Sequence, residues 1–129
     1  MRKILFRGKL SDGKWSFGNL CVDIKGIAII TPDESIIGSY GRVDPESVGQ
    51  YTGLEDKNGK KIFEGDILYC PYNNSNGVVN YSQGMFVVTF GAYSEEALCT
   101  FGDAEIIGNI YDSPEMLKSE DNTNDSKAL

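Results

Sequence analysis

Apolar and charged residues alternate along residues 3–10, whose sequence is KILFRGKL. Successive side chains of a strand point to opposite faces, so this pattern predicts a half-buried β-strand with a basic outer face. The two faces would carry Ile4, Phe6 and Leu10 on one side and Lys3, Arg7 and Lys9 on the other. Asp12-Gly13 then predicts a two-residue type I′ turn into the next extended segment.

Short apolar runs separated by turn residues continue along the rest of the chain. The predicted strands lie at residues 15–22, 24–31, 35–40, 67–70, 77–81, 85–90, 97–101 and 104–111. A spacing of about ten residues per strand is typical of β-barrels and sandwiches. We therefore expect a mainly β fold, namely a small β-barrel-like domain of the SH3-like or multi-sheet kind.

Two short helical turns are predicted, near residues 45–48 and near residues 114–118. Each starts with an acid that can cap a helix, followed by proline and a second acid, as in DPES and DSPE. Residues 1–117 are expected to form one domain, as is usual for a chain of this length. The polar residues 118–129 are predicted to be a disordered C-terminal tail.

Asn58-Gly59 is the strongest hairpin signal of the chain. A two-residue turn at this position would place Asp56 opposite Lys61. Such an opposite-charge pair favours the register by roughly 0.2–1 kcal/mol. We therefore interpret the many acids of residues 43–68 as parts of a folding device and not as an active site.

Composition limits the chemistry that this fold can carry. The 129-residue chain has no histidine and only three widely spaced cysteines, so a Cys/His zinc site is not expected. A serine or cysteine nucleophile would lack its usual histidine base. The charged start of the chain does not have the pattern of a signal peptide, and no apolar run approaches the roughly 18 residues of a membrane span. We expect a soluble, cytoplasmic protein without a membrane partner, a cofactor or a metal.

Charge is distributed unevenly along the chain, whose net charge is −7. Residues 1–65 have a net charge of +1 and residues 66–129 a net charge of −8. A globally acidic chain is a poor nucleic-acid binder, because such affinity comes from neutralising phosphates. A local basic face in the first half remains compatible with that sequence.

Three acidic pairs are candidates for acid–base or metal chemistry: Glu55/Asp56, Glu64/Asp66 and Glu95/Glu96. Strand neighbours point to opposite faces, so the first and third pairs are not expected to converge. Glu64 and Asp66 could share a side, and a divalent-ion site there is the minor alternative. The favoured interpretation of all three pairs is a solvated face or a turn cap, and no catalytic residue is predicted.

A basic set with a nearby aromatic residue is the best candidate for contact with a partner or with nucleic acid. It consists of Arg2, Lys3, Arg7, Lys9, Lys14 and Trp15. Lysine and arginine beside an aromatic ring commonly grip single-stranded nucleic acid. The same face could dock on the acidic half of another subunit. The plain alternative is a solvated strand face.

Three segments resemble the YopX family of phage and prophage proteins: ILFRGKLSDGKWSFGNL, GQYTGLEDKNGKKIFEGDIL and EIIGNIYDSPEML. The resemblance covers residues 1–117 and departs from the family at Phe6-Arg7-Gly8, where we expect Phe-Arg-Ala. Structural roles are implied for the signature residues Gly49, Gln50, Tyr51, Thr52, Gly53, Asp56, Gly59, Gly65, Asp66, Gly108, Asn109, Tyr111 and Pro114. The resemblance implies a mainly β, self-associating protein and brings no established activity.

These observations lead to one principal hypothesis and one alternative. The principal hypothesis is a non-enzymatic phage accessory protein, an interaction module that forms homo-oligomers and binds a host or phage protein. The alternative is a nucleic-acid-binding module that uses the basic N-terminal strand.

Overall fold

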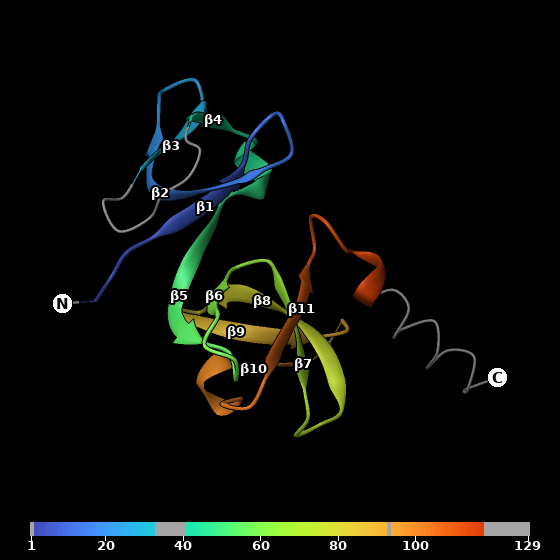
Figure 1. The fold of residues 1–129 in the computed structure, drawn as a ribbon. Helices are drawn as coiled ribbons and strands as arrows, with labels where there is room; N and C mark the ends of the chain where they lie inside the picture. The colour runs from blue at the N-terminus through green and yellow to red at the C-terminus, as the bar shows by residue number, and fades with distance from the viewer. Residues whose placement is uncertain (1, 33–40, 93, 118–129) are drawn as a thin grey trace. The chain divides into compact units, whose positions relative to one another are not determined.

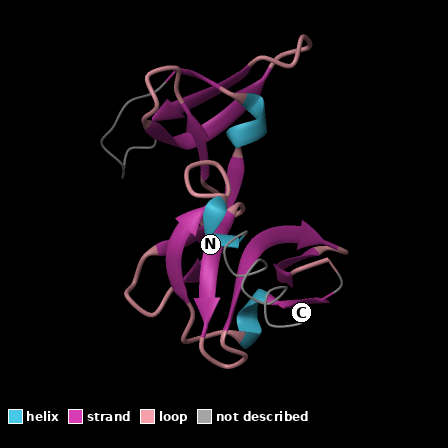
Figure 2. Ribbon diagram, turned by 90° about the vertical axis from the view of Figure 1, so that its right-hand side faces the viewer, coloured by secondary structure: helices cyan, strands magenta, loops and turns pink. Residues whose placement is uncertain are grey.

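A computed structural model describes residues 2–32, 41–92 and 94–117 of the chain (Figure 1). The chain divides into two compact units, residues 1–53 and residues 54–129. Strands dominate both units, as Figure 2 shows. The prediction of a mainly β fold is therefore confirmed.

The first unit is built from antiparallel strands and one 3-10 helix. Its elements are β1 (Phe6–Lys9), β2 (Trp15–Val22), β3 (Ala28–Pro32), β4 (Gly41–Val43), η1 (Pro45–Ser47) and β5 (Gly49–Glu55). Hydrogen bonds join the strands in the order β4-β3-β2-β1-β5, and β6 (Lys61–Phe63) follows β5. Strand β5 therefore starts in the first unit and ends in the second.

The second unit contains an antiparallel sheet with the order β10-β9-β8-β7-β11. The five strands of this sheet and the 3-10 helix of the unit are β7 (Asp66–Cys70), β8 (Ser75–Ser82), β9 (Met85–Phe90), β10 (Ser94–Ala97), η2 (Leu98–Thr100) and β11 (Glu105–Asn109). The register between β7 and β11 shifts between Ile106 and Gly108, which marks a bulge.

The described strands form no closed barrel, so the barrel-like part of the prediction is not confirmed. Both sheets have a linear order with two ends. In the first unit, Leu10 bridges to Val43, and Asp44 N donates a hydrogen bond to Lys9 O at 2.9 Å. The end of β4 thus contacts the end of β1. Because β4 is only three residues long, this contact is a single bridge instead of a full ladder of hydrogen bonds.

The Asn58-Gly59 loop has three residues, not two. Gly59 N donates to Asp56 O at 3.0 Å, and Asp56 N donates to Lys60 O at 2.8 Å. Asp56 therefore pairs with Lys60, and the predicted register with Lys61 is wrong. A type I′ turn needs a positive φ at both central residues, whereas Gly59 has a φ of 83° and Asn58 does not have a positive φ.

The loops that end at Gly13 and Gly26 are built in the same way, with glycine φ values of 87° and 85°. Glycine adopts this left-handed conformation at low cost. The two-residue turn predicted at Asp12-Gly13 is wrong for the same reason as the one at Asn58-Gly59. A two-residue loop is found instead at Gln83-Gly84, where both φ values are positive, 51° and 82°.

Both predicted helical turns are present. The first is η1, where Asp44 Oδ1 accepts a hydrogen bond from Glu46 N at 3.0 Å, as expected of a helix cap. The hydroxyl of Ser47 accepts a hydrogen bond from Lys9 N at 2.7 Å and so ties η1 to β1. The second turn is helical over residues 115–117.

Two predicted strands need correction. Residues 24–27 are a loop, because Asp23 Oδ1 accepts hydrogen bonds from Lys25 N and Ile27 N at 2.8 and 2.9 Å. Residues 98–100 form η2 in place of the strand predicted at 97–101.

Other predictions fall beyond what the structure tests. The strand predicted at residues 35–40 and the tail predicted at residues 118–129 lie outside the described residues. The single domain over residues 1–117 stays a prediction.

Each unit has its own apolar core. The core of the first unit holds Ala28, Ile30 and Val43, with Phe6, Leu10, Leu20 and Val48 packed against them. The core of the second unit holds Ile62, Leu68, Cys70, Val79, Val88, Leu98, Phe101 and Ala104. Burying each large apolar side chain contributes roughly 1.5–3 kcal/mol, so these clusters hold the sheets in shape.

At position 8 the chain has glycine where the YopX resemblance predicts alanine. Packing in the core of the first unit explains this difference. A Cβ atom at Gly8 would lie 2.7 Å from Cγ2 of Val43 and 2.8 Å from its Cβ. Val43 is buried and bridges to Leu10, which restricts its movement. A larger residue at position 8 therefore requires a smaller one at position 43.

We predict that Gly8→Ala destabilises the first unit by about 1–3 kcal/mol, the usual cost of overpacking a core. Val43→Ala should also destabilise it, but the double variant should recover part of the loss, because Val43→Ala removes Cγ1 and Cγ2, two of the three atoms in close contact, although Cβ remains. Urea unfolding followed by the fluorescence of Trp15, the single tryptophan, measures this double-mutant cycle. Strictly additive free energies would contradict the prediction.

Candidate functional site

A tryptophan with two cations against its ring forms the candidate site of the first unit. Trp15 begins β2 and lies opposite Lys9 of β1. Lys9 Nζ lies 5.0 Å and Arg7 Cζ lies 4.7 Å from the centre of the indole ring. Both distances are within the roughly 6 Å at which a cation is attracted to an aromatic face. We name Arg7, Lys9 and Trp15 the tryptophan cluster.

The strand register brings these three residues together. Arg7 and Lys9 are two residues apart on β1, so they share a face of the sheet. Trp15 lies directly opposite Lys9 and diagonally from Arg7. Diagonal neighbours are within reach of long and aromatic side chains.

The face of β1 that carries the bases is not the solvated face that the alternation predicts. Arg7 is 8% exposed and Leu5, on the same face, is 1% exposed. Ile4, which was expected on the buried face, is 54% exposed. The alternation of residues could not predict the burial of Arg7, because its large neighbour Trp15 belongs to the next strand. Burial also strengthens a cation–π contact, which is weaker at exposed positions.

The structure brings together only half of the predicted basic set. Arg2 and Lys3 are exposed and precede β1. Lys14 is exposed too, and its backbone N donates to Asp12 Oδ1 at 3.0 Å within the hairpin loop. The tryptophan cluster therefore consists of the three members that the β1–β2 register places on one face.

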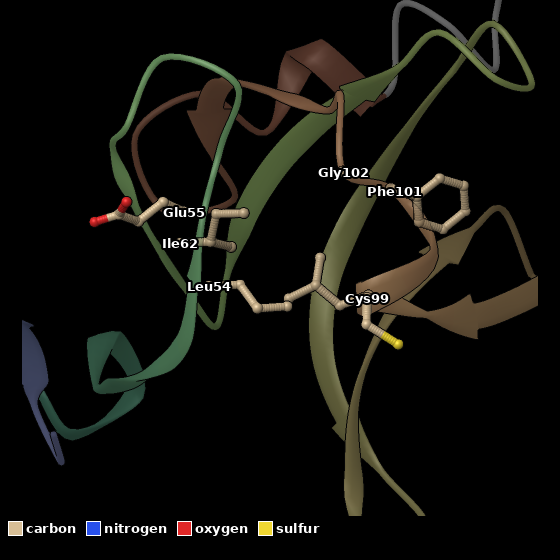
Figure 3. A pocket seen from close by; sticks show the side chains of 7 residues that line it. Leu54, Glu55, Ile62, Cys99, Phe101 and Gly102 are labelled. Carbon is tan, nitrogen blue, oxygen red and sulfur yellow. The ribbon is translucent and has the colours of Figure 1, made fainter. Parts of the chain in front are cut away.

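The second unit has an apolar surface hollow of about 100 Å³ (Figure 3). Its lining residues are Leu54, Glu55, Ile62, Leu98, Cys99, Phe101 and Gly102. Leu54 and Ile62 belong to the β5–β6 hairpin and point toward the segment around η2, while the carboxylate of Glu55 points away. We name this feature the η2 hollow. The sequence did not predict it, because residues 97–101 were expected to be a strand.

Asp56 joins the β5–β6 hairpin, which forms one wall of the η2 hollow, to β11, which follows the other wall in sequence. Its Oδ1 accepts hydrogen bonds from Asn58 N and Lys60 N, both at 2.9 Å, which closes the β5–β6 loop. Its Oδ2 accepts a hydrogen bond from Ile106 N at 3.1 Å, fifty residues away in sequence. One carboxylate therefore joins the hairpin to β11.

Lys57 strengthens the same junction. Its backbone N donates to Ala104 O at 3.0 Å, and its Nζ lies 3.0 Å from Oε1 of Glu105. The hydrogen bond with Glu105 raises the pKa of Lys57. The ion pair is exposed, so we expect it to contribute less than the backbone bonds.

The three hydrogen bonds to Asp56 keep it ionised. Burial opposes ionisation, but the N–H groups of Ile106, Lys60 and Asn58, together with the charge of Lys60, outweigh it and lower the pKa of Asp56. A carboxylate that accepts several backbone N–H groups is stabilised in its charged form.

The thiols differ in their surroundings. Cys70 is buried in the second core, and burial followed by the charges of Asp103 and Glu96 raises its pKa to about 11. Cys99 is exposed in η2, which replaces the strand predicted at residues 97–101. The exposed thiols are Cys21 and Cys99.

Two of the acids proposed as site candidates have structural contacts. Asp66 is 2% exposed, and its Oδ2 accepts a hydrogen bond from Phe63 N at 2.8 Å, as expected of a turn ligand. Glu95 accepts a hydrogen bond from the hydroxyl of Ser82 at 3.0 Å. In the part of the chain that the structure describes, no group of three His, Cys, Asp or Glu is placed to hold a metal. No helix of that part is long and apolar enough to cross a membrane.

Comparison with known proteins decides the family. The family model described as YopX protein matches residues 9–118. The chain belongs to the YopX family. Its fold is also similar to the crystal structure of protein EF1440 from Enterococcus faecalis, with 26% sequence identity and a TM-score of 0.60, covering 91% of this chain and 99% of that one. No curated protein matches the chain.

Residues 49–53 open the second of the three YopX-like segments and form the part of β5 that lies along β1. Gly49 pairs with Arg7, and Tyr51 N donates to Leu5 O at 2.7 Å. Gly49 therefore lies beside the strand that bears the tryptophan cluster. Together with the roles of Asp56 and Gly59 described above, these contacts place the segment in the backbone framework.

The third YopX-like segment forms β11 and the turn that follows it. Asn109 Oδ1 accepts hydrogen bonds from Tyr111 N and Asp112 N at 2.9 and 2.8 Å. A Cβ atom at Gly108 would lie 3.1 Å from Cβ of Ser113, so the close turn leaves little room for a side chain.

Gly65, a further signature residue, joins this turn to β8. Gly65 O accepts a hydrogen bond from Ile110 N, and Gly65 N donates to Val79 O, both at 2.9 Å. Pro114 directly precedes the helical residues 115–117. The contacts described for Gly49, Tyr51, Asp56, Gly65 and Asn109 involve backbone groups, and a structural role for the whole signature set stays a prediction.

We predict that the two cations of the tryptophan cluster contribute unequally to stability. Lys9→Met should destabilise the first unit by about 0.5–1 kcal/mol, whereas Arg7→Met should cost about 2 kcal/mol or more, because Arg7 is buried. Lys14→Met, next to Trp15 but exposed, is the control and should change little. Urea unfolding followed by Trp15 fluorescence checks the order, and equal effects of all three would contradict it.

We predict that Asp56→Asn destabilises the second unit by about 2–3 kcal/mol at neutral pH, because charge-assisted hydrogen bonds are replaced. The folded pKa of Asp56 is lowered, so its contribution is present above the unfolded pKa of about 3.9 and is lost as the pH falls through the folded value. The difference between wild type and variant should therefore shrink on acidification below about pH 4. Denaturation followed by circular dichroism at several pH values measures it.

Asp23→Asn is the matched control for that prediction. Asp23 caps an equivalent loop through two backbone bonds, but it is exposed and those bonds are local. It should therefore cost less than Asp56→Asn. Equal losses in the two variants would show that the bond to Ile106 contributes nothing.

Proposed function

We propose that this YopX-family protein is a non-enzymatic phage accessory protein that acts in the cytoplasm of the host cell. It self-associates and binds a host or phage protein. The observation that carries the proposal is the tryptophan cluster, which places an aromatic ring and two cations on one sheet face.

The residue types of the cluster support a role in protein contact. Tryptophan and arginine are the residues most enriched among those that carry most of the energy of protein interfaces. Trp15 is half-buried and Lys9 is half-buried, so each retains surface for a partner. Arg7 is buried beneath them and would hold the ring in place.

The charge distribution supports self-association in particular. No lysine or arginine occurs between Asp66 and Asp112, whereas residues 1–53 have a net charge of +1. Acidic residues of the second unit such as Glu95, Glu96 and Asp103 are exposed. A cationic surface of one copy and an acidic surface of another attract each other and give specificity to the encounter.

We predict that the wild-type protein forms a species larger than a monomer at tens of micromolar, as measured by size-exclusion chromatography with light scattering. Trp15→Ala should reduce the associated fraction, and added salt should do the same because it screens the attraction. Lys14→Met is the control and should leave the mass unchanged. A strict monomer under these conditions would reject the self-association.

The partner protein requires a separate experiment. Affinity purification of the tagged chain from phage-infected cells, with Trp15→Ala as the control, should recover a protein that the variant does not. Recovery of the same proteins by both forms would reject the tryptophan cluster as the contact.

A second candidate function is binding of single-stranded nucleic acid. The stacked arrangement of Trp15, Arg7 and Lys9 favours it, because aromatic rings with nearby cations hold unpaired bases and their phosphates. Titration with single- and double-stranded DNA and RNA at low and moderate salt tests it. Binding that weakens with salt would support this function, and its absence would reject it.

A further inference from the structure

The tip of the β2–β3 hairpin carries an apolar side chain without any cover. Ile24 is 103% exposed, and Val22 in the same hairpin is 56% exposed. Single exposed apolar residues are common on protein surfaces. Ile24 differs because it stands at the end of a hairpin beside Lys25, so it projects as a knob with a positive charge next to it.

The loop does not need Ile24 for its own structure. Asp23 Oδ1 holds Lys25 N and Ile27 N at 2.8 and 2.9 Å, and Gly26 supplies the left-handed residue. The equivalent first loop position holds Ser11 in the β1–β2 hairpin, which is the polar choice expected at a solvated turn. The side chain of Ile24 is therefore available for an external contact.

The η2 hollow has the size and chemistry to receive such a knob. An apolar cavity of about 150 Å³ takes benzene, so a hollow of about 100 Å³ suits the four carbons of an isoleucine side chain. Its walls include the apolar side chains of Leu54, Ile62 and Phe101. The hollow is present in the single chain, where hydrogen bonds from Lys57 N to Ala104 O and from Ile106 N to Asp56 Oδ2 hold the β5–β6 hairpin beside the segment that follows η2.

The negative charges at the rim of the η2 hollow are complementary to the positive charge beside Ile24. Glu55 lines the hollow with its carboxylate turned outward, and exposed Asp103 follows the lining residue Gly102. Lys25 follows Ile24 directly in the hairpin loop. An apolar side chain that enters the hollow would thus bring a cation toward two acids.

We propose that Ile24 of one copy inserts into the η2 hollow of a second copy, with Lys25 facing Glu55 and Asp103. This contact rests on the self-association proposed above and adds a second pair of surfaces to it, besides the tryptophan cluster. Knob and hollow are different surfaces, so two copies either exchange reciprocal contacts in a two-fold dimer or join head-to-tail into rings or open chains. One such contact is small, so we expect association in the weak range.

Site-directed cross-linking tests the contact directly. The hollow contains the exposed thiol Cys99, so Ile24→Cys in a Cys21→Ser background should give an intermolecular disulfide between positions 24 and 99 upon oxidation with diamide. Ser11→Cys in the same background is the matched control, because it stands at the equivalent position of the neighbouring hairpin. Peptide mass spectrometry identifies the linked residues.

The cross-linking outcomes decide the proposal. A 24–99 bond between copies, absent from the Ser11→Cys control, supports it. A 24–99 bond within one chain, or dimers linked only 24–24 or 99–99, would overturn it.

Mixing two variants tests whether the knob of one copy pairs with the hollow of another. Ile24→Ser removes the knob, and Gly102→Leu fills the hollow, where a Cβ atom meets nothing within 4 Å and φ is not in the left-handed range. Each variant alone should associate about 10- to 100-fold more weakly than wild type, since a buried apolar side chain is lost from the contact. The mixture should form a one-to-one dimer, because the intact knob of one variant fits the intact hollow of the other.

The result also separates this inference from the proposed function. Variants that associate as well as wild type would overturn the knob-and-hollow contact while self-association stands. A monomeric wild-type protein, together with an Ile24→Cys variant that gives no intermolecular cross-link, would overturn both. Circular dichroism of each variant confirms that it is folded.

Discussion

The second unit depends on the carboxylate of Asp56. It closes the β5–β6 loop through Asn58 N and Lys60 N, and it reaches Ile106 N of β11 at 3.1 Å. Without this bond the partly buried backbone N–H of Ile106 would lose its partner, which destabilises a fold. The η2 hollow lies between the hairpin and the segment that leads into β11, so the bond that joins hairpin and β11 supports its shape.

In the first unit, an aromatic ring lets a charged side chain occupy a covered face. A buried guanidinium is costly unless its charge is compensated. The ring of Trp15 offers a negative face at 4.7 Å, and the antiparallel register between β1 and β2 holds it there. The tryptophan cluster is therefore a well-packed, positively charged surface in residues 1–53, the less acidic part of the chain. Such a surface is suited to an acidic partner, which connects the local packing to the proposed role in association.

Sequence reasoning succeeded where the signal is local and failed where a neighbour in space decides. The helix cap of Asp44 and the turn contact of Asp66 follow from residue types within a few positions. The loop at Asn58-Gly59 was placed correctly but given the wrong length, since a one-residue difference depends on φ values that Asn-Gly does not uniquely determine. Burial of Arg7 and the hollow beside Cys99 involve other strands and could not be read from alternation.

The sequence by itself determined the class of fold, the positions of most turns and the family, because alternation, Gly and Pro act over short distances and the signature is continuous. It also determined the uneven charge, which is a property of composition. The tertiary structure alone decided that the bases of β1 meet Trp15, that Asp56 bonds across fifty residues to Ile106, and that Ile24 is left uncovered. These outcomes depend on which strands pair and in which register, and such long-range pairing is not encoded in any single stretch of residues.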